Sequence, residues 1–172
     1  MNTDTPSASD SAPATAAAEY RTRFEQLLPE LVNRSGAALE VESLREESCL
    51  APEVEEQQTE TRWVGMAGGA LPDSVAANTA LDDVGGWLDA DGWEKQNEVS
   101  NPPEEGGDVR TLLYAKGDLG MVATYRENGG PSIELLLTSP CTVQPEDHRM
   151  QRSDLDPEYG TSSQYYDDAV AG

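Results

Sequence analysis

Cys49 and Cys141 are the two residues of this sequence whose type and placement most clearly predict chemistry. Each flanks the part of the chain that has regular apolar patterning, and neither belongs to a C-x-x-C pair. Two cysteines in this arrangement predict one structural disulfide, which persists only in an oxidising compartment. The alternative is two unrelated thiols in a cytosolic protein. Neither cysteine has a neighbouring histidine or basic cluster that would make it a nucleophile.

Other side chains that could perform chemistry lack partners in the sequence. Asp89, Asp91 and Glu98 partly match a calcium-binding loop, but its first ligand position would be occupied by a tryptophan, which cannot coordinate calcium. His148 stands alone beside two acids, and a metal site or catalytic relay needs partners from elsewhere in the fold. No nucleophile elbow, phosphate-binding loop or dinucleotide fingerprint occurs. We therefore expect no enzyme, no cofactor and no metal site, with a carboxylate-based hydrolase the weakest alternative.

Aromatic side chains provide the main candidates for a binding surface. The chain has three tryptophans and a single phenylalanine, so the tryptophans must supply much of the core volume. Core packing is the first interpretation of these residues, and an aromatic groove between a helix and the sheet is the second. The candidate binding residues are Trp63, Trp87, Trp93, Tyr114 and Tyr125.

Two amphipathic helices are expected to position these residues. Apolar residues at helical spacing between Tyr20 and Val32 predict the first helix, which Pro29 should kink or break. A second stripe predicts another helix over residues 74–88. Two adjacent glycines at 85–86 weaken that helix. Their presence indicates that the helix packs closely against a neighbouring element at this point, where a larger side chain would not fit.

Strand patterns surround the two helices. The clearest is a hairpin in which Gly117-Asp118 forms a two-residue turn of type II′. The segments with strand character are 39–49, 61–67, 111–116, 119–126 and 133–138, and a further strand is expected to open at Trp93. Helices and strands in this order predict an α+β fold, with two helices packed on one antiparallel sheet of about four to five strands.

The domain boundaries follow from the apolar pattern. Residues 19–142 are expected to form a single α+β domain. Residues 1–18 are rich in Ser, Thr, Ala and Pro and predict a disordered tether. Residues 143–172 are expected to be a disordered acidic tail, whose tyrosines are either solvated or form a short recognition motif.

The charge of the chain excludes two classes of partner. With 33 acidic and 11 basic residues, its formal net charge is −22. Affinity for nucleic acid or for anionic membranes requires clustered Lys and Arg, so neither is an expected partner. No run of 18 or more apolar residues occurs, so no transmembrane segment is predicted.

The layout of residues 20–142 resembles that of actinobacterial cell-envelope lipoproteins and secreted proteins of unknown function. The shared features are a Ser/Thr/Ala/Pro-rich tether, a first helix, Cys49, the strand at Arg62-Trp63-Val64, the pair Gly92-Trp93, and a closing strand that ends in Ser-Pro-Cys141. The resemblance implies an extracytoplasmic, disulfide-closed α+β domain without known enzymatic activity. It also implies a lipid anchor that was removed together with a signal sequence ahead of Met1, although the anchor cysteine itself is absent here.

We therefore expect a non-enzymatic binding or accessory module of the bacterial cell envelope, with an unknown protein or small ligand as its partner. The main alternative is an acidic mimic of DNA whose carboxylates occupy the basic groove of a nucleic-acid-binding enzyme. A related alternative is an immunity-type inhibitor that neutralises a basic toxin. The DNA-mimic hypothesis predicts acids lined up on one surface and free thiols, whereas the envelope hypothesis predicts dispersed acids and a disulfide.

Overall fold

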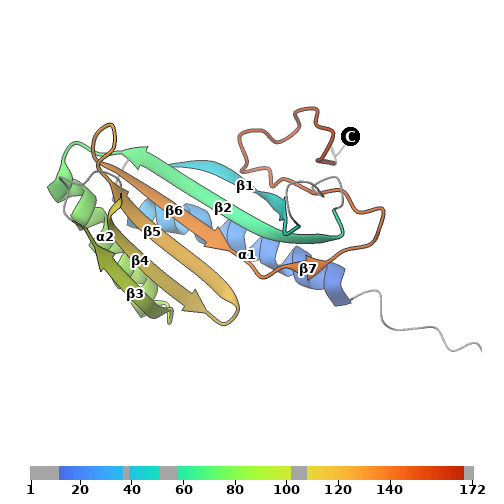
Figure 1. Ribbon diagram of the computed structural model, residues 1–172, viewed down its shortest axis with the longest axis horizontal. Helices are drawn as coiled ribbons and strands as arrows, with labels where there is room; N and C mark the ends of the chain where they lie inside the picture. Colours follow the sequence, from blue (N-terminus) through green and yellow to red (C-terminus); the bar gives the residue numbers. More distant parts are fainter. Residues whose placement is uncertain (1–11, 37–38, 51–57, 102–107, 169–172) are drawn as a thin grey trace, which may run out of the picture.

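The computed structural model describes residues 12–36, 39–50, 58–101 and 108–168 (Figure 1). Two helices pack on one face of a large antiparallel sheet, which confirms the expected α+β class. The sheet order is β1-β2-β6-β5-β4-β3, with β7 paired to β2. The elements are α1 (Ala12–Arg34), β1 (Glu40–Ser48), β2 (Glu60–Ala70), α2 (Ser74–Ala90), β3 (Glu94–Ser100), β4 (Asp108–Lys116), β5 (Leu119–Arg126), β6 (Ser132–Thr138) and β7 (Thr142–Val143).

The sheet has seven strands, more than the four to five that were expected. All seven residues of β3 are exposed, so this strand has none of the alternation that marks a half-buried strand. β7 has only two residues and is defined by its pairing with β2 rather than by any pattern of its own.

Helix α1 begins at Ala12, inside the segment that was expected to be a disordered tether. Alanine has the highest helix propensity, and the Ala-rich stretch before Tyr20 extends the amphipathic helix towards the N-terminus. The helix continues through Pro29. Phe24, Leu28 and Leu31 are fully buried in the core. Residues 1–11 of the expected tether lie outside the described residues.

Helix α2 is fixed at its start by a side-chain cap and in its middle by a close approach to the sheet. The side chain of Asp73 accepts a hydrogen bond of 2.8 Å from the backbone N–H of Ala76, which satisfies one free donor of the first turn. A Cβ atom on Gly85 would lie 3.2 Å from the hydroxyl oxygen of Tyr114, so glycine lets the helix approach β4. Gly86 has no such neighbour.

The turn between β4 and β5 matches the expected hairpin. Lys116 pairs with Leu119 across the turn, and Gly117 has a φ of +64°, the left-handed region that a type II′ turn requires at its first position. The hydroxyl group of Tyr20 in α1 donates a hydrogen bond to the carboxylate of Asp118 in this turn. The hairpin tip is thereby tied to the first helix.

This contact predicts an unusual titration for Tyr20. The hydrogen bond to the Asp118 carboxylate raises the pKa of the Tyr20 phenol to about 12, because the phenol can donate only while it keeps its proton. Because the pKa of this phenol is higher in the folded than in the unfolded chain, the hydrogen bond contributes its full stabilisation below pH 10. The contribution is lost as the pH rises from 10 towards 12. Asp118→Asn should therefore return the Tyr20 pKa towards 10, as measured by NMR of the tyrosine Cζ carbon.

Tyr125 provides the internal reference for this titration. Burial, together with a hydrogen bond to the carboxylate of Glu127, raises the pKa of Tyr125 to about 12 by contacts that do not involve Asp118. Its resonance should titrate identically in the wild type and in Asp118→Asn. An unchanged Tyr20 pKa in the variant would contradict the prediction.

Residues 144–168, which we call the C-terminal strap, fold back beside β1 (Figure 1). The backbone N–H of Glu46 donates to the carbonyl of Gln151 (2.9 Å), and the N–H of Ser153 donates to the carbonyl of Leu44 (2.8 Å). The expectation that residues 143–172 form a disordered tail is therefore wrong for residues 144–168, and residues 169–172 lie outside the described part. Hydrogen bonds and ion pairs, rather than an apolar stripe, hold this segment in place, so hydrophobic periodicity could not reveal it.

Candidate binding groove

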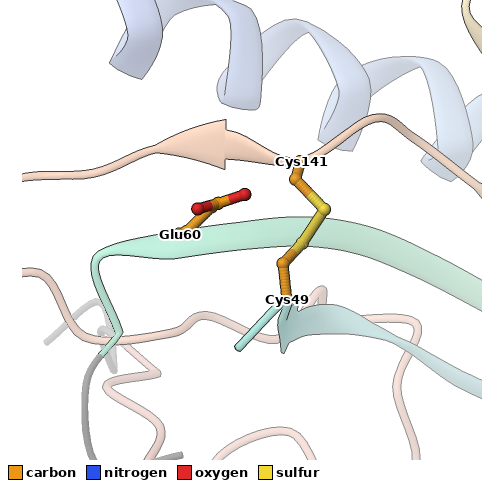
Figure 2. A group of neighbouring side chains, drawn as sticks. All are labelled: Cys49, Glu60 and Cys141. Atoms are coloured by element: carbon orange, nitrogen blue, oxygen red, sulfur yellow. A yellow bond between two sulfur atoms is a disulfide. The ribbon is translucent and has the colours of Figure 1, made fainter. Parts of the chain in front are cut away.

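The disulfide predicted from the sequence is present. Cys49, directly after β1, is bonded to Cys141, which lies between β6 and β7, with a Cα–Cα distance of 6.2 Å (Figure 2). The backbone N–H of Cys49 also donates to the carbonyl of Glu60 at the start of β2 (2.9 Å). The bond therefore connects the end of the edge strand β1 to the segment between β6 and β7, and these two partners lie on opposite sides of β2.

Most of the candidate aromatic residues belong to the core. Trp63, Trp93, Tyr114 and Tyr125 are each at most 4% exposed, so all four are core residues, as the core-packing interpretation of the tryptophans predicts for Trp63 and Trp93. Trp87 is only partly buried and packs against the core from α2. The structure thus brings the five residues into one domain but does not gather them on one surface.

Two of the tryptophans nevertheless meet in a groove between the helices. Trp87 of α2 and Trp93 just after α2 line a cavity of about 240 Å³. Residues spaced by three or four positions on α1 form the opposite wall, because this spacing places them on one face of a helix. The complete lining is Arg23, Gln26, Leu27, Glu30, Trp87, Asp91, Trp93 and Lys116.

Comparisons with known proteins give no match. No protein-family model, no curated protein and no solved structure is similar to this chain. Within the described part of the chain, neither helix is both long enough and apolar enough to span a membrane. The chemistry of the groove is therefore the best guide to what it binds.

Two of the charged pairs at the groove are satisfied internally. Lys116 Nζ lies 2.8 Å from a carboxylate oxygen of Asp91, and Glu30 pairs with Arg34 at 2.7 Å. Arg23, in contrast, forms no ion pair with any described residue. The groove thus offers one exposed cation, Arg23, that no described residue holds in an ion pair.

The indole N–H of Trp93 is a buried donor without an acceptor in the described part of the chain. This nitrogen is buried and has no hydrogen-bond partner among the described residues, although Trp93 itself is 4% exposed. A buried donor without a partner costs free energy, and a small rotation of the Trp93 side chain that turns its N–H towards an acceptor in the groove would recover it. The sequence identified both tryptophans, but not Arg23 or Lys116, because only the packing of α1 against α2 and the hairpin brings them together.

A second cavity, of about 690 Å³, lies between the C-terminal strap and the segment before β2, and His148 lines it. His148 stands alone in the sequence, but in the fold its Nε2 atom lies 2.9 Å from the carboxylate of Glu46. Glu46 is almost fully buried and also accepts from the backbone N–H of Gln151 (2.8 Å) and the hydroxyl group of Thr61 (3.2 Å). Through these hydrogen bonds, Glu46 of β1 and His148 anchor the strap to β1 and β2.

Proposed function

We propose that the protein is a non-enzymatic, extracytoplasmic binding or accessory module of the bacterial cell envelope, lipoprotein-like in its layout. The groove between α1 and α2 is its contact site. The observation that carries this proposal is that Trp87, Arg23 and Trp93 line one groove, where, among the described residues, Arg23 is an exposed cation without an ion-pair partner and the buried indole N–H of Trp93 has no acceptor. The Cys49–Cys141 disulfide supports the extracytoplasmic location, because such bonds persist in oxidising compartments.

The donors in the groove define the class of ligand. A carboxylate accepts hydrogen bonds from both a guanidinium and an indole N–H, and a charged acceptor gives the stronger bonds. Trp87 supplies an apolar surface beside them, and the volume of about 240 Å³ limits the ligand to a small group. The proposed ligand is a short amphipathic anion, either free or as the end of a partner's side chain.

The alternative function, an acidic mimic of DNA or an immunity-type inhibitor, rests on the net charge of −22. The described acids are spread over both helices, β1, β3 and the C-terminal strap, and bases interrupt them. Arg110, for example, lies 2.8 Å from both Asp82 of α2 and Glu98 of β3. A dispersed and partly neutralised set of carboxylates favours the binding module over a surface that imitates a phosphate backbone.

Phenylacetate, which joins a carboxylate to a small apolar ring, is a suitable probe of the groove. We expect it to shift the indole N–H resonances of Trp87 and Trp93 in a ¹⁵N NMR titration and to leave that of Trp63 in place. Arg23→Gln should weaken this binding by at least about tenfold, because it removes a charged hydrogen-bond donor. Phenethylamine, with the same ring and the opposite charge, should cause no saturable shift.

Arg62→Gln is the matched control, since Arg62 is a surface arginine of β2 that does not line the groove. This variant should bind phenylacetate as the wild type does. Equal shifts with phenylacetate and phenethylamine, or equal affinities of Arg23→Gln and the wild type, would refute the assignment of the groove to an anion.

A further inference from the structure

Three side chains that can coordinate a metal meet at the disulfide (Figure 2). The sulfur atoms of Cys49 and Cys141 and a carboxylate oxygen of Glu60 all lie within 4.8 Å of one another. No other group of three or more such side chains occurs among the residues that the structure describes. Cys49 and Glu60 are partly buried and Cys141 is exposed, so the group is accessible to a solvated ion.

The backbone holds these three residues together independently of the S–S bond. Cys49 follows a ladder between β1 and β2 that ends with Ser48 opposite Thr61, and it bonds through its own N–H to Glu60. Cys141 is held on both sides. The N–H of Ser139 donates to the carbonyl of Trp63 (3.0 Å) before it, and Thr142 pairs with Thr61 after it. Breaking the disulfide therefore leaves both thiols beside the carboxylate.

We propose that the reduced protein binds Zn²⁺ through the Cys49 and Cys141 thiolates and the Glu60 carboxylate, with a water molecule as the fourth ligand. Tetrahedral zinc with Zn–S distances of about 2.3 Å places two sulfur atoms roughly 3.8 Å apart. Side-chain rotation about the two Cα–Cβ bonds provides this separation. Two thiolates and a carboxylate form a ligand set that zinc prefers over magnesium or calcium.

The disulfide form and the zinc form are connected by two steps, reduction of the S–S bond and binding of Zn²⁺. A dithiol reductant breaks the S–S bond, gives two electrons and two protons to the cysteines, and is itself oxidised to a disulfide. Binding of Zn²⁺ then releases the two thiol protons to water, because the thiolate is the ligand. The same position thus holds a disulfide under oxidising conditions and a metal ion under reducing conditions, and either one ties the end of β1 to the segment before β7.

Cobalt provides a direct test, because Co²⁺ bound to thiolates in a tetrahedral site absorbs in the near ultraviolet and in the visible range. The full chain is reduced with a phosphine, which carries no competing thiol, and is titrated with Co²⁺ under argon. We expect a complex of one ion per chain that Zn²⁺ displaces, and no such absorption from the disulfide form. Glu60→Gln should weaken Co²⁺ binding by at least about tenfold, because it removes an anionic ligand.

Glu47→Gln is the matched control, since Glu47 is a partly exposed acid of β1 outside the group of three ligands. If the reduced protein shows no Co²⁺–thiolate absorption after addition of Co²⁺, the proposal is overturned. Equal affinities of Glu60→Gln and the wild type for Co²⁺ would also overturn it. If the reduced chain unfolds, the far-ultraviolet circular dichroism of the folded state should return on addition of Zn²⁺. An unfolded chain that Zn²⁺ does not refold would also overturn it.

Discussion

Replacing Cys49 and Cys141 together with serine should lower the free energy of unfolding by about 4–5 kcal/mol. The bond closes a loop with a sequence separation of 92, and the entropy of an open loop of that length stabilises the unfolded chain by this amount. For a chain of this size the melting temperature should fall by roughly 10–20 °C. Thermal unfolding of the wild type with and without a reductant, in the presence of a metal chelator, measures the same quantity.

The free-thiol count of protein purified without reductant accompanies this experiment. We expect no free thiol, and alkylation of living cells before lysis should likewise leave Cys49 and Cys141 unmodified. Replacing the same two cysteines with alanine should give the same loss, which separates the effect of the bond from the cost of introducing serine. Two free thiols together with an unchanged melting temperature would contradict both the stabilisation and the proposed compartment.

Arg152→Met should release the C-terminal strap from β1. The side chains of Arg152 and Asp168 are both 4% exposed and form an ion pair at 3.1 Å. The guanidinium also donates to the hydroxyl oxygen of Thr161 (2.8 Å) and lies 4.5 Å from the ring centre of Tyr166. Removing the cation leaves the Asp168 carboxylate buried without its partner, which costs about 3–5 kcal/mol.

Hydrogen exchange at the β1 edge measures this release. The N–H of Glu46 bonds to the strap carbonyl of Gln151, and the N–H of Leu44 bonds to the carboxylate of Asp156 (2.9 Å). Exchange of these two amides should accelerate at least about tenfold in Arg152→Met, while the amides in the centre of the sheet keep their protection.

Two further variants, one outside this ion pair and one that removes both of its charges, test the assignment. Arg34→Met, which removes an exposed arginine of α1, should leave the exchange of Leu44 and Glu46 unchanged. In Arg152→Met with Asp168→Asn, part of the protection should return, because no buried charge is left unpaired. Unaltered exchange of both amides in Arg152→Met would show that the pair does not hold the strap.

The parts of the fold that the sequence predicted are those with a regular signal. Alternating apolar residues and a Gly-Asp turn predicted the hairpin of β4 and β5, and spaced apolar residues predicted the cores of both helices. The position of Cys49 and Cys141 at the two ends of this pattern predicted their bond. The alanines before Tyr20 have no apolar period, so the sequence did not predict where α1 begins. The strand expected to open at Trp93 is β3, but its extent could not be predicted because none of its residues is buried.

The C-terminal strap and the groove show what periodicity cannot capture. The strap depends on buried polar contacts between residues far apart in the chain, such as His148 with Glu46, which are 102 positions apart. In the groove, Trp87 and Trp93 were candidates because tryptophan is scarce and large. Arg23 is one of several arginines of α1, and only the crossing of the two helices distinguishes it.

The position of the C-terminal strap also bears on how this protein avoids aggregation. An open sheet has two edge strands, and each exposes backbone groups that can template the addition of a strand from another molecule. At β3, charged side chains and a bulge between Lys95 and Asn97 discourage such pairing. At β1, the chain covers part of its own edge with Gln151 and Ser153. A protein shortened before residue 144 would lose this protection at one edge while keeping it at the other.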